Sequence, residues 1–123
     1  MRCENRIWLS HSLPSDRFVE QFDREILNRP LKDDDTIRPG SVYLLTWGRR
    51  HSQQLLDRMA ALFDVDIFIL GHQAQQQGWS QAGDNLIILA SDHNQGCLLP
   101  LELDRQHTIE ELTDSMVPLT SIA

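Results

Sequence analysis

Long apolar runs are missing from this 123-residue chain, and basic charge and cysteine are scarce. No run approaches the roughly 20 residues that a membrane-spanning helix needs, and no apolar segment typical of a secretory signal follows the N-terminus. The formal net charge of −7 argues against a nucleic-acid partner, because such proteins carry a basic patch. It also disfavours adhesion to an anionic membrane surface. We therefore expect a cytoplasmic protein that binds neither nucleic acid nor membrane.

The two cysteines, Cys3 and Cys97, lack the spacing of a metal-binding pair. Reduced thiols in a cytosolic protein are the expectation, and a single disulfide is the alternative. The length suits one domain over residues 1–123, and a chain of this size buries roughly two-thirds of its surface without a disulfide. No repeat or linker divides the sequence.

Four short apolar runs end at polar clusters that contain a histidine. The runs and their histidines are residues 6–9 with His11, 42–46 with His51, 67–70 with His72 and 86–90 with His93. Short runs of this kind are typical of buried strands. In α/β sheets, ligand sites lie in the loops beyond the strand ends. The four clusters are therefore the candidate functional sites.

The apolar periodicity predicts strands alternating with helices. We expect strands at residues 6–9, 42–46, 66–70, 86–90 and 97–103, the last at a sheet edge because of Pro100. Helices are expected at residues 15–27 and 52–63 and from Thr108, where Thr108 and Glu111 form a capping box before Pro118. Residues 28–40 are expected to form a loop with solvated aspartates at 33–35, and residues 73–83 a loop or weak hairpin. The order β-α-β-α-β-β-β-α predicts an α/β fold with a mixed sheet, or α+β.

The polar clusters offer ligands for metal and phosphate. A neutral imidazole suits Zn, Fe and Mn, although a histidine after a strand more often bonds to nearby backbone. His72 is favoured over His11 because Gly71 allows the backbone to approach a ligand. The planar guanidinium groups of Arg49 and Arg50 can hold phosphate oxygens, and ordinary surface charge is the alternative.

The order of these clusters resembles the C-terminal half of the calcineurin-like metallophosphoesterases, in the phosphoprotein phosphatase branch. The matching stretches are Ile-Trp-Leu-Ser-His-Ser-Leu-Pro at 7–14, Thr-Trp-Gly-Arg-Arg-His-Ser at 46–52, Phe-Ile-Leu-Gly-His-Gln at 68–73 with Gly78 downstream, and Asn-Leu-Ile-Ile-Leu-Ala-Ser-Asp-His-Asn at 85–94. The resemblance covers about residues 5–104. Each stretch is short, and the match lies in their order and spacing together.

The resemblance implies half of an α/β/β/α sandwich that carries part of a two-metal site. His11 and His72 are similar to metal-ligand histidines, and Arg50, or in second place Arg49, to the arginine that binds the substrate phosphate. The implied activity is hydrolysis of phosphomonoesters of a protein or a small molecule, like that of a serine/threonine phosphatase, with two divalent ions of the Mn, Fe or Zn type. The loop of Asp92, His93 and Asn94 borders the site, with no role assigned.

The motifs that open this family are absent from the chain. They are Asp-x-His, Gly-Asp-x-x-Asp-Arg-Gly and Gly-Asn-His-Asp/Glu, and the pair Gly83-Asp84 has neither the required continuation nor the required place before His11. These motifs supply the bridging aspartate, further ligands and the proton donor, so no catalytic residue is expected in this chain. Two histidines and an arginine cannot hold two ions. We therefore expect little or no phosphatase activity from the chain alone.

A missing half would leave strand edges and an apolar sheet face uncovered. The chain is then expected to be a fragment of a longer reading frame, or to pair with a second copy or with a separate partner that covers the sheet.

Two other interpretations stay open. One is a non-catalytic α/β binding or interaction module that keeps the scaffold without a tightly bound metal. The other is an unrelated small α/β domain with structural histidines, which predicts that His11 and His72 lie far apart. A separation of the imidazoles above roughly 8 Å would exclude a shared cluster, since metal–nitrogen bonds are ~2 Å and paired metals lie ~4 Å apart. A Ser-His-Asp hydrolase is disfavoured because no Gly-x-Ser-x-Gly elbow is present.

Overall fold

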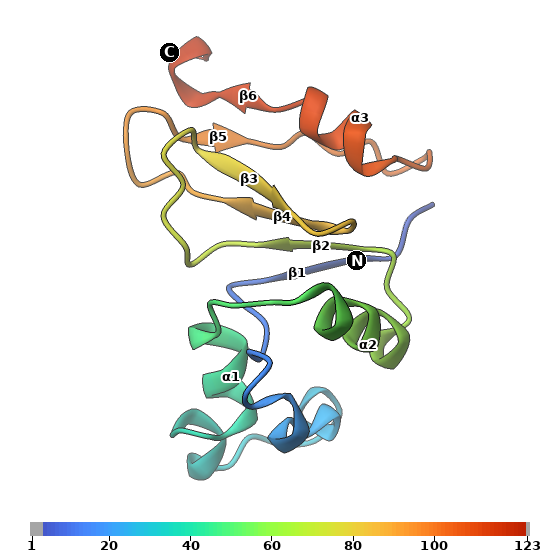
Figure 1. Ribbon diagram of the computed structural model, residues 1–123, viewed down its shortest axis with the longest axis vertical. Coiled ribbons are helices and arrows are strands. Elements are labelled where there is room, and N and C mark those ends of the chain that lie inside the picture. Colours follow the sequence, from blue (N-terminus) through green and yellow to red (C-terminus); the bar gives the residue numbers. More distant parts are fainter. Residues whose placement is uncertain (1–3, 123) are drawn as a thin grey trace.

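A four-stranded mixed sheet forms the centre of the computed structural model, which describes residues 4–122 (Figure 1). The strand order is β1 (Ile7–Ser10), β2 (Ile67–Leu70), β4 (Leu86–Leu89) and β3 (Trp79–Ala82). The first three strands are parallel, and β3 pairs antiparallel with β4. The predicted α/β fold with a mixed sheet is confirmed at this level.

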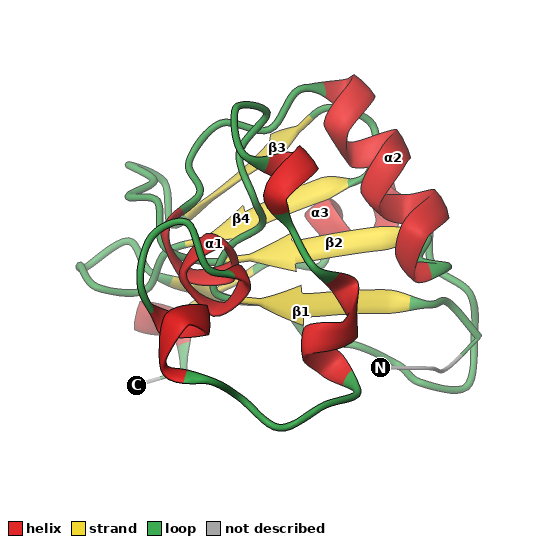
Figure 2. Cartoon of the chain, turned by 90° about the horizontal axis from the view of Figure 1, so that it is seen from below, coloured by secondary structure: helices red, strands yellow, loops and turns green. Residues whose placement is uncertain are grey.

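Helices cover both faces of the sheet. On one face lie α1 (Ser41–Trp47) and α2 (Gln53–Phe63), and on the other lie α3 (Ile109–Asp114) and a two-stranded ladder of β5 (Cys97–Leu98) with β6 (Val117–Pro118) (Figures 1 and 2). The 3₁₀ helices are η1 (Val19–Gln21), η2 (Arg24–Leu27), η3 (Asp33–Thr36) and η4 (Leu119–Ser121). Across residues 4–122, every helix is too short or too polar to cross a membrane.

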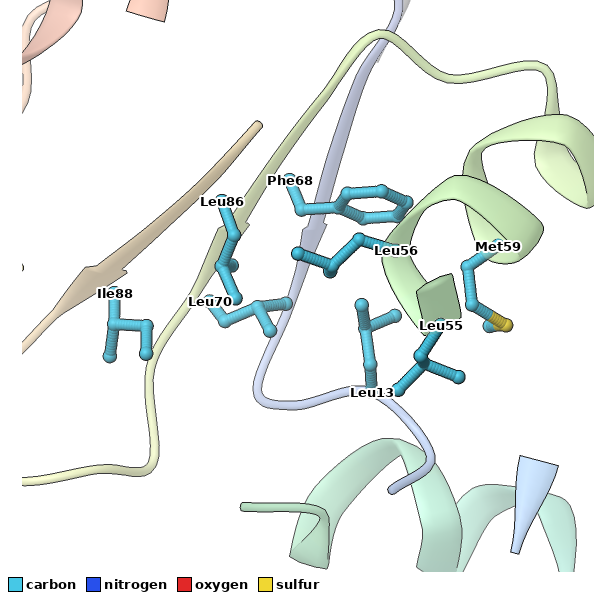
Figure 3. Packing of buried hydrophobic residues seen from close by; sticks show 8 residues of the cluster. All are labelled: Leu13, Leu55, Leu56, Met59, Phe68, Leu70, Leu86 and Ile88. Carbon is cyan, nitrogen blue, oxygen red and sulfur yellow. The ribbon is translucent and has the colours of Figure 1, made fainter. Parts of the chain in front are cut away.

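Strand β2 is buried along its whole length and contributes to both hydrophobic cores. Phe68 and Leu70 point toward α2 (Figure 3), whereas Ile67 and Ile69 pack on the opposite face with Leu112 of α3. This alternation follows from the two-residue period of a strand. A run of four apolar residues is what a parallel strand covered on both faces requires.

Helix α2 agrees with the sequence prediction, including its N-cap. The hydroxyl of Ser52 accepts the N–H of Leu55 at 3.2 Å, and the apolar side chains Leu55, Leu56 and Met59 face the sheet (Figure 3). The predicted capping box of α3 is also present, with Thr108 and Glu111 satisfying each other's backbone N–H groups.

The helix predicted at residues 15–27 is wrong. The chain forms two short 3₁₀ turns there, separated by extended backbone at Phe22 and Asp23. The Asp23 N–H donates to the Ser41 hydroxyl at 2.8 Å, and its carboxylate caps η2 by accepting the N–H of Glu25. An aspartate that satisfies backbone groups locally competes with helix continuation, and this outweighs the apolar period.

The strand predicted at residues 42–46 is also wrong, because this segment is helix α1. The residues with high strand propensity at 42–46 do not make this segment a strand, since strand propensity depends on a neighbouring strand and on burial. Here the segment packs against η2 and η3, and Leu44 is 3% exposed. Without the 3₁₀ helices, the observed order is therefore β-α-α-β-β-β-β-α-β rather than the predicted β-α-β-α-β-β-β-α.

The C-terminal predictions are correct only in part. The strand predicted at residues 97–103 shortens to β5, and Pro118 lies in β6 rather than at the end of α3. Residues 73–83 contain β3, so the weak-hairpin alternative is the correct one. Cys97 is a buried free thiol, and Cys3 lies outside the described residues.

The aspartate run at 33–35 differs from the predicted solvated charge at one position. Asp35 is buried and accepts two N–H groups of the Arg29 guanidinium, both at 2.8 Å, and the N–H of Lys32 at 2.7 Å. The hydrogen bonds from Arg29, followed by that from Lys32, lower the pKa of Asp35 from 3.8 to about 2. Arg29 also pairs with Asp23 at 3.0 Å, so this cluster holds the segment between β1 and α1 together.

The Asp35 cluster predicts a loss of stability in acid. A carboxyl group whose pKa is depressed on folding stabilises the folded state above its ordinary pKa, and this contribution is lost as the pH falls through the folded value. We expect the free energy of unfolding to fall between about pH 4 and pH 2. In Asp35→Asn the fall over this range should shrink, with lower stability at pH 7. Urea unfolding at several pH values measures this, and Asp33→Asn, an exposed neighbour in η3, is the control. An unchanged profile in Asp35→Asn would contradict the prediction.

Candidate functional site

The parallel strands β1, β2 and β4 end on the same side of the sheet, so the residues that follow them come together there. A pocket of about 410 Å³ lies there, lined by residues that follow β1, β2 and β4. Its polar members include His11, His72 and Asp92. The structure therefore brings residues from three of the four predicted clusters together around one pocket.

His11 and His72 contact each other directly. Nε2 of His11 lies 2.8 Å from Nδ1 of His72, and the ring centroids are 4.7 Å apart. The β1–β2 pairing sets this position, because Ser10 pairs with Leu70 and the Gly71 N–H donates to the His11 carbonyl at 3.2 Å. His72 itself has a left-handed backbone with φ of 67°.

Arg49 completes a chain of three side chains. Its Nε–H donates to Nε2 of His72 at 3.2 Å. A guanidinium only donates, so this ring nitrogen accepts and carries no proton. A neutral His72 therefore carries its proton on Nδ1 and donates it to Nε2 of His11. This arrangement holds His72 neutral, with Nε2 of His11 as the acceptor.

The electrostatics of the pair agree with this assignment. Partial burial lowers the pKa of His72, and the nearby His11 and Arg49 lower it further. A second proton on His72 would have to occupy Nε2, where the Arg49 N–H already points. The site therefore opposes a positive charge on His72.

The remaining histidines of the described residues bond to backbone carbonyls. Nε2–H of His51 donates to Leu13 at 3.1 Å, that of His93 to Gln75 at 2.7 Å, and that of His107 to Glu102 at 2.8 Å. Burial lowers the pKa of His51. His93, which was given no definite role, lies outside the pocket that holds the histidine pair.

The loop that carries Arg49 is tied to the loop after β1. The Ser12 N–H donates to the Leu45 carbonyl at 2.8 Å, and the Ser12 hydroxyl donates to the Gly48 carbonyl. A Cβ at Gly48 would lie 1.7 Å from the Leu13 carbonyl oxygen, so the close approach requires glycine. This link brings the residues after α1 close to the ends of β1 and β2, although the segment before them is a helix and not the predicted strand.

The structure thus places the two predicted arginines differently. Arg49 contacts His72, whereas Arg50 lines a neighbouring hollow of about 420 Å³ together with Arg49 and Trp47. Sequence reasoning missed Trp47, whose ring lies at the edge of His72 with centroids 5.3 Å apart. The feature of the sequence that could have indicated Trp47 is Gly48, which follows it and allows the chain to approach the loop after β1 closely.

The facing nitrogens fit two ligands of one metal ion. Two nitrogens bound to the same ion at about 2.1 Å each lie roughly 3.0 Å apart at a right angle and about 3.4 Å apart in a tetrahedral site, so the 2.8 Å that separates them here would widen on binding. In residues 4–122, no group of three or more His, Cys, Asp or Glu side chains gathers in a metal-binding arrangement. At this place residues 4–122 could therefore offer a metal ion two imidazoles and no third ligand of these types.

Comparisons with models of protein families, with curated proteins and with solved structures find no match to this chain. What the site can do must therefore follow from its own chemical groups.

The contact between Arg49 and His72 predicts a linked titration. In metal-free protein, Arg49→Ala should raise the pKa of His72 toward 6.5, because it removes a nearby positive charge and the donor that occupies Nε2. NMR titration of the imidazole signals in the presence of a chelator measures this. Arg50→Ala is the matched control and should shift His72 much less. Equal shifts in both variants, or a lowered pKa in Arg49→Ala, would contradict the assignment.

Proposed function

We propose that this chain is the C-terminal part of a metal-dependent phosphoesterase of the calcineurin-like type, acting on phosphomonoesters as serine/threonine phosphatases do. The observation that carries the proposal is the pair of His11 and His72, with facing nitrogens 2.8 Å apart, and the Arg49 guanidinium bonded to it. The family resemblance assigns the two histidines to metal, and it assigns Arg50, with Arg49 in second place, to phosphate.

The pair would hold one divalent ion of the Mn, Fe or Zn type. Nε2 of His11 and Nδ1 of His72 would be the donor atoms. The proton on Nδ1 of His72 would then move to Nε2 of the same ring, and the Arg49 N–H that faces Nε2 would turn away. When bound, metal ions of such sites polarise the phosphate and lower the pKa of a bound water. The second ion and the remaining ligands belong to the half of the sandwich that this chain does not supply.

The arginines would bind the phosphate oxygens. A guanidinium offers a planar fork that matches phosphate geometry. Arg49 is already positioned by its bond to His72, and Arg50 lies in the adjoining hollow. We propose that Arg49 lies against the metal-bound phosphate and that Arg50 reaches it from the side.

The expectation of an uncovered apolar sheet face is wrong for residues 4–122, because α2 covers one face and α3 the other. Support for a second polypeptide segment comes instead from the open edge of the sheet. Within residues 4–122, β1 lies at the edge of the sheet with β2 as its one neighbouring strand, and Leu9 on β1 is 52% exposed. An edge strand with an exposed apolar side chain favours pairing with another segment. We propose that this segment brings the missing ligands, so that the complete phosphatase forms only with it.

Metal binding tests the histidine pair. We expect Mn²⁺ or Zn²⁺ to bind the isolated chain, and His11→Ala or His72→Ala to weaken binding at least about tenfold, since loss of even an indirect partner of a metal costs that much. Calorimetric titration and elemental analysis measure this. His93→Ala, at the backbone-bonded histidine, is the control and should bind normally. Equal metal binding by all variants would contradict the histidine pair as the metal site, and no binding by the unaltered chain would favour a non-catalytic module that retains the scaffold.

Activity tests the incomplete site. The isolated chain should hydrolyse p-nitrophenyl phosphate little or not at all, because two imidazoles cannot hold two metal ions. Restoring the upstream segment of its reading frame should restore both metal content and hydrolysis. Activity of the isolated chain that is abolished by His72→Ala, in protein free of contaminating phosphatase, would contradict the expected inactivity.

A further inference from the structure

Unpaired arginines gather beside the site, although the chain carries a net charge of −7. Arg6, Arg24, Arg29, Arg58 and Arg105 each form an ion pair with a carboxylate. The exposed residues Arg17, Arg38, Arg49 and Arg50 form no such pair with any carboxylate among residues 4–122. In an acidic protein, unneutralised basic groups in one place mark a surface that favours an anionic partner.

These four arginines, which we call the arginine surface, line two adjoining hollows. One hollow of about 420 Å³ contains Arg17, Arg49 and Arg50, and the other of about 200 Å³ contains Arg38. Ser15 and Trp47 line both hollows. Because Trp47 and Arg49 also contact His72, the arginine surface begins at the histidine pair and extends away from it.

Asp16, the carboxylate in the larger hollow, is already engaged. It accepts the Ser52 N–H at 3.1 Å and the Ser52 hydroxyl at the start of α2. This has two consequences. The Asp16 charge is directed to α2 rather than to the arginines, and the N-terminus of α2 is occupied and offers no binding site for a phosphate.

Aromatic rings hold the far end of the arginine surface in place. The guanidinium carbons of Arg17 and Arg38 lie 5.3 and 4.9 Å from the centre of the Phe18 ring. Such cation–π contacts keep both groups near one place while their charges stay exposed. Trp47 stacks on Tyr43 with centroids 6.1 Å apart and is 56% exposed, so it offers an apolar surface between the two ends.

We propose that the arginine surface selects phosphorylated peptides in which acidic residues adjoin the phosphorylated residue. This deepens the proposed function and rests on it: the phosphate would lie at His11, His72 and Arg49, and the carboxylates at Arg17, Arg38 and Arg50. Separate guanidinium groups spread over two open hollows match separate carboxylates along an extended chain. A compact polyphosphate favours convergent donors such as the backbone N–H groups of a free helix N-terminus, and at the nearby N-terminus of α2 Asp16 and Ser52 occupy that place.

Peptide binding to the isolated chain tests this proposal. Fluorescence polarisation compares four labelled peptides: a phosphoserine peptide with aspartates beside the phosphoserine, the same peptide with alanines there, and the two unphosphorylated forms. Each exposed ion pair contributes roughly a two- to fivefold gain in affinity. We expect the acidic phosphopeptide to bind about tenfold more tightly than the neutral phosphopeptide, with a difference that shrinks as salt is added.

Paired variants assign the effect to the arginine surface. The double variant Arg17→Ala, Arg38→Ala should lose most of the preference for acidic residues and keep its affinity for the neutral phosphopeptide. The variant Arg17→Lys, Arg38→Lys should retain much of the preference, which separates charge from folding. Arg24→Ala removes one exposed positive charge, which within residues 4–122 pairs with its neighbour Glu25, and it should leave all four affinities unchanged.

The outcomes separate this proposal from the proposed function. Equal affinity for acidic and neutral phosphopeptides, or stronger competition by ATP than by the acidic phosphopeptide, overturns the arginine surface as a peptide site. A preference for acidic residues that persists with no gain from phosphate supports the arginine surface and counts against the phosphoesterase site. A gain in affinity from the phosphate without a preference for acidic residues supports the phosphoesterase site and counts against the arginine surface as a peptide site.

Discussion

The parallel pairing of β1 with β2 determines where the candidate site lies. Ser10 is paired with Leu70, so the residues that follow them leave the sheet at the same level and bring His11 against His72. A shift of one residue would turn Phe68 and Leu70 from one hydrophobic core to the other, which makes such a shift very unfavourable. The hydrophobic cores on both faces of β2, rather than the histidines themselves, therefore maintain the histidine pair.

The sequence predicts best those elements whose own pattern is sufficient. β2 and β4 are uninterrupted apolar runs, and α2 has an N-cap and one apolar face, so each was placed correctly. Residues 15–27 and 42–46 were assigned wrongly because distant groups determine their structure. Asp23 bonds to Ser41 and Arg29, and α1 packs on η2 and η3. The local pattern of apolar residues gives no information about these contacts.

The residues of the candidate site also fall into those that the sequence could identify and those that it could not. His11 and His72 follow strands, and a sheet with parallel strands brings such residues together, so the sequence could identify them. Trp47 is the last residue of α1 and Arg49 follows that helix, and both reach the site through the bonds from Ser12 to Leu45 and Gly48. This is a contact between segments more than 30 residues apart, and only the folded chain shows which of the two adjacent arginines touches the pair.

The left-handed backbone of His72 has a consequence for how this protein could change over generations. A side chain other than glycine in that conformation costs roughly 1 kcal/mol, and glycine at the position would remove the cost together with the imidazole. At position 72, the residue that forms the histidine pair therefore lowers the stability of the folded chain. Lineages or laboratory libraries selected for folding alone should drift toward glycine or asparagine there, whereas a histidine that persists at position 72 would record selection for what its ring binds.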